Sequence, residues 1–287
     1  MEAGQPAGDV VDSNLGGAYA PDLYRPTGTA ELLPHVAAFG GAEIRRYREQ
    51  GFVGIEQVLD QDDVQAGLGG LDDLLAGRNP DFNGVMLEKS AADESDTLRA
   101  RLDRVRKLFY YVKYDTRLDA LSRHPAVLSV VRALLGGREP VLFQDMALLK
   151  PPQIGREKPW HQDHAYFDLP LDEKVVGVWI ALDRATIENG CMQFLAGGHL
   201  AGPQLHWMRR DWQICDTQML GKESVACPLP PGGAVFFDSL VPHGTPQNSS
   251  PDRRRALQFH YVARDAKRVP TEERLRVFGT DGKDVTC

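Results

Sequence analysis

His161 and Asp163 stand two residues apart, a spacing with which two side chains can bind one metal ion. On an extended segment, residues i and i+2 project from the same face. His243 directly follows an apolar stretch, where a strand would end in a loop. Two histidines and one carboxylate form the facial set that holds Fe(II) with neighbouring positions open. Spacing alone leaves a zinc site open as the alternative.

Three consecutive arginines, Arg253 to Arg255, offer a cation for a bound anion. A keto acid could chelate two open positions on the metal and leave one for O₂. Its distal carboxylate would then need a cation, best the bidentate fork of an arginine. Alternation places Arg254 and the even-numbered residues up to His260 on one face of the predicted strand, and Arg253 and Arg255 on the other. The alternation of side chains alone does not show which of these two faces points to the interior of the protein.

Short strands fill the second half of the chain. The predicted strands have β-branched or aromatic residues and are separated by Gly and Pro; they cover 140–150, 175–183, 191–197, 224–229, 232–238 and 254–263. A turn is predicted at Glu188–Gly190. Short strands with few helices between them indicate antiparallel sheets in a sandwich or barrel.

Helical patterns precede these strands. The apolar spacing predicts helices over 41–51, after an N-cap at Asp60, and from His124–Pro125 onward. Residues 1–28 are rich in Gly, Ala, Pro and Asp, so we predict an arm that contributes little to the core. Residues 79–97 are polar and irregular, and we predict a loop that forms part of a lid, with a passive connection as the alternative.

Composition excludes several classes of protein. The chain has 287 residues and a net charge of −7, with 7 basic and 18 acidic side chains in residues 1–100. An acidic chain does not favour binding to nucleic acid. No run of 18 apolar residues indicates a membrane span, and the N-terminus lacks the pattern of a secretory signal. Four widely spaced cysteines argue against a disulfide framework, so we expect a cytoplasmic protein.

Four motifs together resemble one known family. They are "WHQDHAYFDL", "ENGCMQFLAGGHLAG", "PPGGAVFFDSLVPHGTPQNSS" and "RRRALQFHYV", in this order. Their order and spacing resemble the phytanoyl-CoA dioxygenase family of Fe(II)/2-oxoglutarate oxygenases. The resemblance covers roughly residues 40–265 and is strong from Met146 to Val262.

The resemblance implies a site as well as a family. The iron ligands of the family fall on His161, Asp163 and His243. Its 2-oxoglutarate arginine, eleven residues after the distal histidine, falls on Arg254, and Thr245 is implied to help hold the same carboxylate. Related halogenases have Ala or Gly in place of the carboxylate ligand, so the aspartate here implies hydroxylation or another oxidation.

Further positions follow from the same resemblance. Trp179, Met146 and Lys107 are implied to contact 2-oxoglutarate, although a surface lysine is an equal reading of Lys107. Three residues after the ligand pair are candidates for a substrate pocket: His164, Tyr166 and Phe167. For the two aromatic residues, core packing is the preferred role. His199 matches a structural turn, and His124, His206 and His260 receive no role.

The implied fold is mainly β with flanking helices: a double-stranded β-helix, or cupin-like jelly-roll. We expect one oxygenase domain over residues 29–287, with the β-helix core at about 140–265 and a flexible arm over 1–28.

The implied activity is a dioxygenase that uses Fe(II), 2-oxoglutarate and O₂ to hydroxylate, or otherwise oxidise, a C–H bond of a small organic molecule, releasing succinate and CO₂. Catalysis is assigned to a metal-bound oxidant, and no separate acid or base is assigned. An acyl-CoA substrate is the main variant. The alternatives are a jelly-roll binding or scaffold protein with a vestigial metal site, and a zinc hydrolase or lyase.

Overall fold

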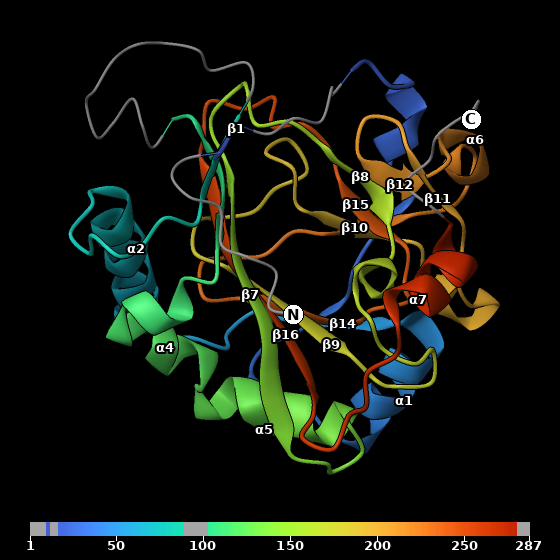
Figure 1. The fold of residues 1–287 in the computed structure, drawn as a ribbon, viewed down its shortest axis with the longest axis horizontal. Helices are drawn as coiled ribbons and strands as arrows, with labels where there is room; N and C mark the ends of the chain where they lie inside the picture. Colours follow the sequence, from blue (N-terminus) through green and yellow to red (C-terminus); the bar gives the residue numbers. More distant parts are fainter. Residues whose placement is uncertain (1–9, 12–16, 89–102, 280–287) are drawn as a thin grey trace.

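Two β-sheets form the framework of the protein, which is seen here in a computed structural model that describes residues 10–11, 17–88 and 103–279 (Figure 1). The larger sheet has nine strands in the order β1 (Val10–Val11), β5 (Val85–Leu87), β6 (Val105–Phe109), β7 (Pro140–Lys150), β16 (Arg254–Ala263), β9 (Val176–Ala181), β14 (Ala234–Asp238), β4 (Phe52–Ile55) and β3 (Leu32–Leu33). The central strands β7, β16, β9 and β14 all pair antiparallel with their neighbours.

The smaller sheet has five strands in the order β2 (Gly28–Thr29), β13 (Val225–Cys227), β10 (Met192–Phe194), β15 (His243–Thr245) and β8 (Lys158–His161). A two-stranded ribbon, β11 (His206–Met208) and β12 (Trp212–Ile214), lies beside β8 (Figure 1). The predicted class, a mainly β jelly-roll with flanking helices, is confirmed. Within the described residues the two sheets do not close into a barrel.

Helices cover the outer face of the larger sheet. The three helices α2 (Gln61–Leu75), α4 (Thr116–Ser122) and α5 (Pro125–Leu134) lie along one side of it (Figure 1). Their apolar residues pack in one buried cluster with β9 and β16 side chains such as Val178, Ile180 and Phe259. Two further helices, α6 (Asp216–Met219) and α7 (Thr271–Phe278), lie toward the smaller sheet, while α1 (Gly41–Gln50) packs beside β4 of the larger sheet.

The space between the two sheets holds a second apolar cluster. Its largest side chains include Phe52, Trp179, Phe194 and Phe237. Because successive strand residues point to opposite faces, β9 and β16 supply side chains to both clusters. Burying both faces of the central strands makes them a rigid floor for any site on the inner face.

The helix starts follow local rules. The Asp60 carboxylate accepts a hydrogen bond from the Asp63 amide at 2.9 Å and caps α2, as predicted. Pro125 opens α5, where its missing N–H costs nothing. In the part of the chain that the structure describes, no helix is both long enough and apolar enough to cross a bilayer.

Two expectations fail at the N-terminal side of the chain. Leu23 and Tyr24 are buried, so the prediction that residues 1–28 contribute little to the core is wrong at these positions. The Tyr24 ring stacks on Trp160 at 5.9 Å between centroids, one residue before His161. A short turn without apolar periodicity gives no sequence signal of such docking.

The segment predicted as an irregular loop is also partly ordered. Residues Val85–Leu87 form β5, which pairs antiparallel with β6. Three apolar residues in a polar stretch are too few for a pattern, and the pairing is set by β6 instead. Residues 89–97, on which the rest of the lid prediction depends, and most of residues 1–16 lie outside the described residues.

Candidate metal and cosubstrate site

The end of β8 presents the first two candidate ligands. His161 is the last residue of the strand, Gln162 keeps extended backbone angles, and Asp163 begins a 3₁₀ turn, η4 (Asp163–Tyr166). The Gln162 side chain donates to the carbonyl oxygens of Gly202 and Leu240 at 2.9 and 2.6 Å. These bonds fix the turn that separates the two ligands.

His206, which had no role in the sequence analysis, supports the same turn. Its Nε2 accepts a hydrogen bond from the Gln162 backbone N–H at 3.0 Å, and its Nδ1 lies 2.9 Å from the Gln204 carbonyl oxygen. The backbone between the ligands is therefore held by a buried imidazole.

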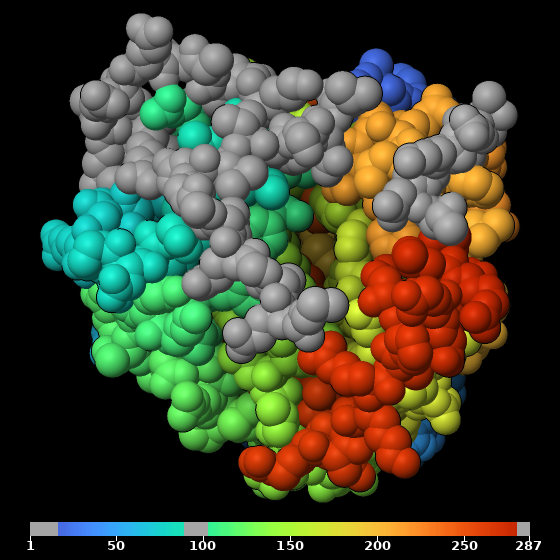
Figure 2. Space-filling model, viewed as in Figure 1, coloured from blue at the N-terminus to red at the C-terminus, as the bar shows by residue number. Residues whose placement is uncertain are grey.

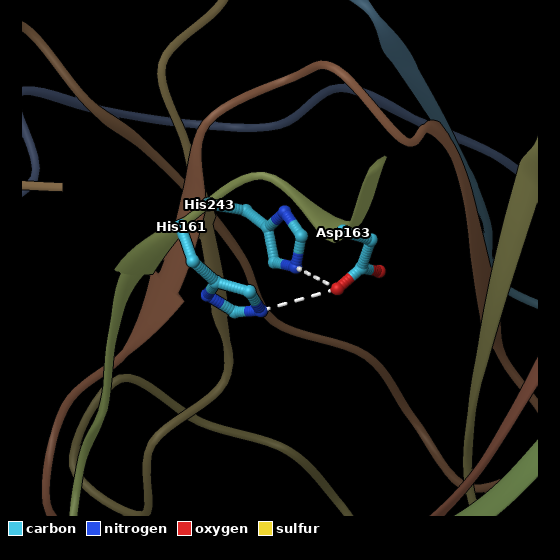
Figure 3. A group of neighbouring side chains, drawn as sticks. All are labelled: His161, Asp163 and His243. Atoms are coloured by element: carbon cyan, nitrogen blue, oxygen red, sulfur yellow. Dashed lines mark ion pairs between the residues drawn. The ribbon is translucent and has the colours of Figure 1, made fainter. Parts of the chain in front are cut away.

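The third candidate ligand lies directly across the sheet. In the antiparallel pair β15–β8, His243 is the partner of His161, and the ring centroids are 4.3 Å apart. Asp163 Oδ1 lies 3.1 Å from His161 Nε2 and 3.6 Å from His243 Nε2. The three side chains point toward one another (Figure 3), and their ligand atoms lie within 4.8 Å of each other. This arrangement could hold one metal ion.

Backbone carbonyls orient both rings. His161 Nδ1 lies 2.7 Å from the Pro159 carbonyl oxygen, and His243 Nδ1 lies 3.0 Å from that of Val241. A proton on each Nδ1 leaves both Nε2 lone pairs directed at the site. Burial, reinforced by His243, lowers the pKa of His161 to about 3, and burial also lowers the pKa of His243. Both rings are thus neutral near pH 7, as metal binding requires.

The carboxylate between the rings is held ionised. Burial alone would raise the pKa of Asp163, but the neighbouring rings of His243 and His260 and the hydrogen bond from His260 hold it well below its ordinary value. Its second oxygen, Oδ2, lies 2.7 Å from His260 Nε2 and 3.3 Å from Gln258 Nε2. Both of these residues come from β16 of the larger sheet.

Arg254 lies on the same inner face of β16, which answers the question that alternation left open. Its side chain is buried, and its two contacts, to the carbonyl oxygens of Gly190 and Leu148, are long at 3.4 and 3.5 Å. Among the described residues its Nε has no hydrogen-bond partner. Burial lowers the pKa of Arg254 to about 10, so the guanidinium remains charged. A buried cation with unused donors is built for an anion.

The guanidinium of Arg254 packs over the indole ring of Trp179. The Arg254 carbon Cζ lies 5.1 Å from the centre of the indole ring, which is fully buried between the sheets. The other two arginines are used elsewhere. Arg255 forms a bidentate pair with Asp183 at 2.9 Å for both bonds, and Arg253 pairs with Asp103.

One cavity of about 250 Å³ joins the metal cluster and Arg254. The face drawn in Figure 2 is hollowed near its centre, between green segments on one side and yellow to orange segments on the other. Of the residues singled out in the sequence, the cavity is lined by His161, Asp163, His243, Arg254, Thr245, Met146, Lys107, Tyr166 and Phe167.

Two predicted positions do not line this cavity. Trp179 lies beneath Arg254, as described. His164, predicted as a pocket residue, is buried behind the turn, with its Nδ1 2.9 Å from Ser239 Oγ and its Nε2 3.3 Å from the Leu169 carbonyl oxygen. His164 directly follows Asp163, and neighbouring side chains do not share a face, so the pocket assignment of His164 is wrong.

The cavity is also lined by Gln258 and Lys150, which the sequence analysis did not assign. Gln258 was only placed on the face of Arg254, as was His260, which lies behind the cavity lining, and Lys150 was not singled out. Lys150 is the β7 partner of Arg254, and its Nζ donates to the carbonyl oxygens of Arg156 and Pro246. Burial, and then Arg254, lower the pKa of Lys150 well below its ordinary value. A lysine that ends a long, mostly apolar strand was the available signal.

A polar rim lies beside His161. Lys158 Nζ lies 2.6 Å from Asp211 Oδ2 and 3.1 Å from the Tyr166 hydroxyl, which itself donates to the Trp212 carbonyl oxygen at 2.7 Å. The ring of Tyr166 stands edge-on to His161. Tyr166 is 37% exposed whereas Phe167 is 3% exposed, so core packing holds for Phe167 alone.

Comparison with known proteins identifies the family to which this site belongs. The family model described as phytanoyl-CoA dioxygenase (PhyH) matches residues 47–256, a range that contains the metal cluster and Arg254. The chain belongs to this family. The PhyH region therefore begins in α1 and ends inside β16.

Individual relatives agree with this assignment. The chain is 26% identical over 265 residues to the phytanoyl-CoA dioxygenase domain-containing protein 1 of Bos taurus, covering 79% of this chain and 91% of the relative. Among solved structures it is similar to EvdO2 of Micromonospora carbonacea var. aurantiaca complexed with 2-oxoglutarate, with 27% identity, a TM-score of 0.64, and coverage of 85% and 98%. The fold is also that of SnoK, a non-heme alpha ketoglutarate dependent carbocyclase from nogalamycin biosynthesis, with 24% identity, a TM-score of 0.64, and coverage of 88% and 97%.

Proposed function

We propose that this PhyH-family protein is an Fe(II)- and 2-oxoglutarate-dependent dioxygenase that hydroxylates, or otherwise oxidises, a C–H bond of a small organic molecule. One observation carries the proposal: a His161–Asp163–His243 cluster opens on the same cavity as a buried arginine with unused donors. In the hydroxylation, the substrate C–H, 2-oxoglutarate and O₂ give the alcohol, succinate and CO₂. O₂ would supply the oxidising equivalents, 2-oxoglutarate would supply two of the electrons that reduce it, and bound iron would be the centre that activates O₂.

The donor set supports iron with a keto-acid cosubstrate. Two imidazoles and one carboxylate leave neighbouring positions free for a chelating cosubstrate and O₂. A structural zinc site would use four protein ligands, whereas three lie together here among the described residues. The guanidinium of Arg254, buried in the same cavity, matches the distal carboxylate of a keto-acid cosubstrate.

The residues around Arg254 fit the cosubstrate. The guanidinium would bind the distal carboxylate of 2-oxoglutarate, and the Thr245 hydroxyl would donate to it. Trp179 would hold the guanidinium in place, and Met146, which faces Gln258 across β7 and β16, would contact the carbon chain. We assign Lys107 to the cosubstrate as well, because it lines the same cavity.

The substrate is proposed to be a free small molecule, because the cavity of about 250 Å³ must hold 2-oxoglutarate and the reacting part of the substrate together. Tyr166 and Phe167 are the substrate-pocket candidates that remain. An acyl-CoA is the competing substrate class, in which only the acyl end would enter the cavity. Turnover of matched free acids and CoA thioesters distinguishes the two.

The extent of the enzyme domain is part of the proposal. We propose one oxygenase domain over residues 29–287, supported by an apolar cluster that runs from Tyr47 to Tyr261. The cytoplasm is proposed as its compartment, supported by three buried cysteines that form no disulfide among the described residues, Cys191, Cys215 and Cys227.

Metal-dependent consumption of 2-oxoglutarate tests the function. The purified protein, freed of metal and then supplied with Fe(II), 2-oxoglutarate and O₂, should form succinate slowly even without substrate, and Asp163→Ala should not. Succinate formation with Fe(II) but not Zn(II) supports the oxygenase. Metal binding without any succinate, across a substrate library, would instead support the binding-protein alternative.

A further inference from the structure

The carboxylate of Asp163 is contacted on both sides, by different elements. Its Oδ1 faces the Nε2 atoms of His161 and His243 from the smaller sheet, at 3.1 and 3.6 Å. Its Oδ2 faces His260 Nε2 and Gln258 Nε2 from β16 of the larger sheet, at 2.7 and 3.3 Å. The two oxygens of one ligand therefore have separate surroundings.

The His260 ring makes polar contacts through Nε2 and is otherwise surrounded by apolar rings. It is fully buried, and within the described residues its Nδ1 has no hydrogen-bond partner. The ring of Phe167 packs against it with ring centroids 4.9 Å apart, and the ring of Phe237 with centroids 6.2 Å apart. The angles between the ring planes are 67° and 84°. Among the described residues, Nε2 is the polar atom of this ring that has partners, and its shorter contact is to Asp163 Oδ2.

Gln258 strengthens the same contact. It is two residues before His260 on β16, so both side chains emerge on the inner face, and their Nε2 atoms are 3.2 Å apart. Two donors that converge on one carboxylate oxygen occupy the lone pairs that would otherwise bind a cation. A buried carboxylate oxygen held in this way is costly to release.

We propose that His260 and Gln258 are positioning residues that restrict Asp163 to metal binding through Oδ1 alone. This inference rests on the proposed function, in which three positions on the ion must stay free, two for the cosubstrate and one for O₂. A carboxylate that bound through both oxygens would take one of them. Contacts that orient a metal ligand commonly change metal affinity about 10–100-fold when they are removed.

Substitutions at His260 separate its hydrogen bond from its volume. Gln Nε2 is as many bonds from Cα as His Nε2, so His260→Gln keeps a donor toward Asp163, whereas His260→Leu fills the site without one. Tyr261→Phe is the matched control, since it removes a buried hydrogen bond of the next β16 residue, to the Ser122 carbonyl oxygen at 2.6 Å, on the opposite face.

Anaerobic Co(II) titration, followed by visible absorption and equilibrium dialysis, measures the effect without turnover. His260→Leu should weaken Co(II) binding about 10–100-fold and alter the absorption band, while His260→Gln and Tyr261→Phe stay within about threefold of the parent protein. The KM for 2-oxoglutarate should rise in His260→Leu, because Asp163, binding through both oxygens, would compete with the cosubstrate for a position on the metal.

The opposite results overturn the inference. Co(II) affinity and spectrum unchanged in His260→Leu, or an equal loss in His260→Gln, would mean that the hydrogen bond does not position Asp163. If His260→Leu does not fold, Gln258→Met decides, since unchanged binding there rejects the role and weaker binding supports it. A parent protein that binds Co(II) but never consumes 2-oxoglutarate would reject the proposed function while this comparison still stands.

Discussion

His161 and His243 are cross-strand partners: they face each other in the β8–β15 pair, with ring centroids 4.3 Å apart. Two residues that are 82 positions apart in the sequence are therefore directly paired in the sheet. Each ring is oriented by a carbonyl of its own segment, so the site does not depend on metal to bring the two rings together. Preformed ligands make metal loss separable from unfolding.

Replacing His243 by Ala should abolish stoichiometric Fe(II) or Co(II) binding and succinate formation, because two ligands remain where three are needed. The metal-free protein should remain folded, and circular dichroism would show this. His124→Ala is the control, since His124 pairs with Asp63 outside the cavity. Full metal binding by His243→Ala would show that the ligand assignment is wrong.

Replacing Arg254 by Met should raise the KM for 2-oxoglutarate by about 30-fold or more, as expected when a buried charge-assisted pair loses one partner. Arg253→Met removes a partly exposed pair with Asp103 and should change that KM by less than about threefold. Steady-state succinate formation at varied 2-oxoglutarate measures both. The reverse order of effects would place the cosubstrate elsewhere.

Replacing Tyr24 by Ala should lower the free energy of unfolding by about 3 kcal/mol, because a buried ring that packs on Trp160 leaves a cavity. The lost hydrogen bond from its hydroxyl to Glu157 Oε2, 2.7 Å long, adds to this. Urea unfolding of the metal-free protein measures the change. Arg25→Ala, at an exposed neighbour, should have an effect below about 0.5 kcal/mol, and an equally small effect of Tyr24→Ala would show that this segment is not part of the core.

Stability of the metal-free protein should fall as the pH drops below 6.5. Burial lowers the pKa of His161 to about 3 and of His206 to about 4, from an ordinary value of 6.5. Between pH 6.5 and about 4 the unfolded chain therefore takes up protons that the folded protein does not, which costs up to about 1.4 kcal/mol per pH unit for each ring. Urea unfolding at pH 7.5, 6.5 and 5.5 measures the slope.

His206→Gln should reduce that slope without abolishing it, because one buried ring no longer titrates while the pKa values of His161, His164 and His243 are still lowered by burial. The carboxylates with lowered pKa, Asp163 and Asp211, remain ionised across this range and do not contribute to it. Equal free energies of unfolding at pH 7.5 and 5.5 in the parent protein would contradict the buried, neutral state of these rings.

Strands with long, mostly apolar runs were predictable from sequence. The expected strands at 140–150 and 254–263 match β7 and β16, because their long apolar runs fit a sheet that is covered on both faces. Motif order then identified the cluster of His161, Asp163 and His243, whose members the structure brings together.

Contacts that depend on the third dimension were not predictable. His260 approaches Asp163 from the other sheet, 97 residues away, and a strand histidine carries no local sign of its partner. The docking of Tyr24 on Trp160 joins segments 136 residues apart in the same way. His164 failed for a different reason, since it directly follows Asp163 and neighbouring side chains do not share a face.

Strand β16 carries Arg254, Gln258 and His260 on one face, opposite the cluster that faces the helices. Side-chain direction repeats every two residues, so one inserted or deleted residue between Arg254 and Gln258 would move the arginine and the Asp163 contacts onto different faces. A single substitution changes one of these contacts at a time. A change of length here would disrupt both cosubstrate binding by Arg254 and the contacts of Gln258 and His260 with Asp163. In descendants of this gene, the four-residue interval should therefore drift in composition and stay fixed in length.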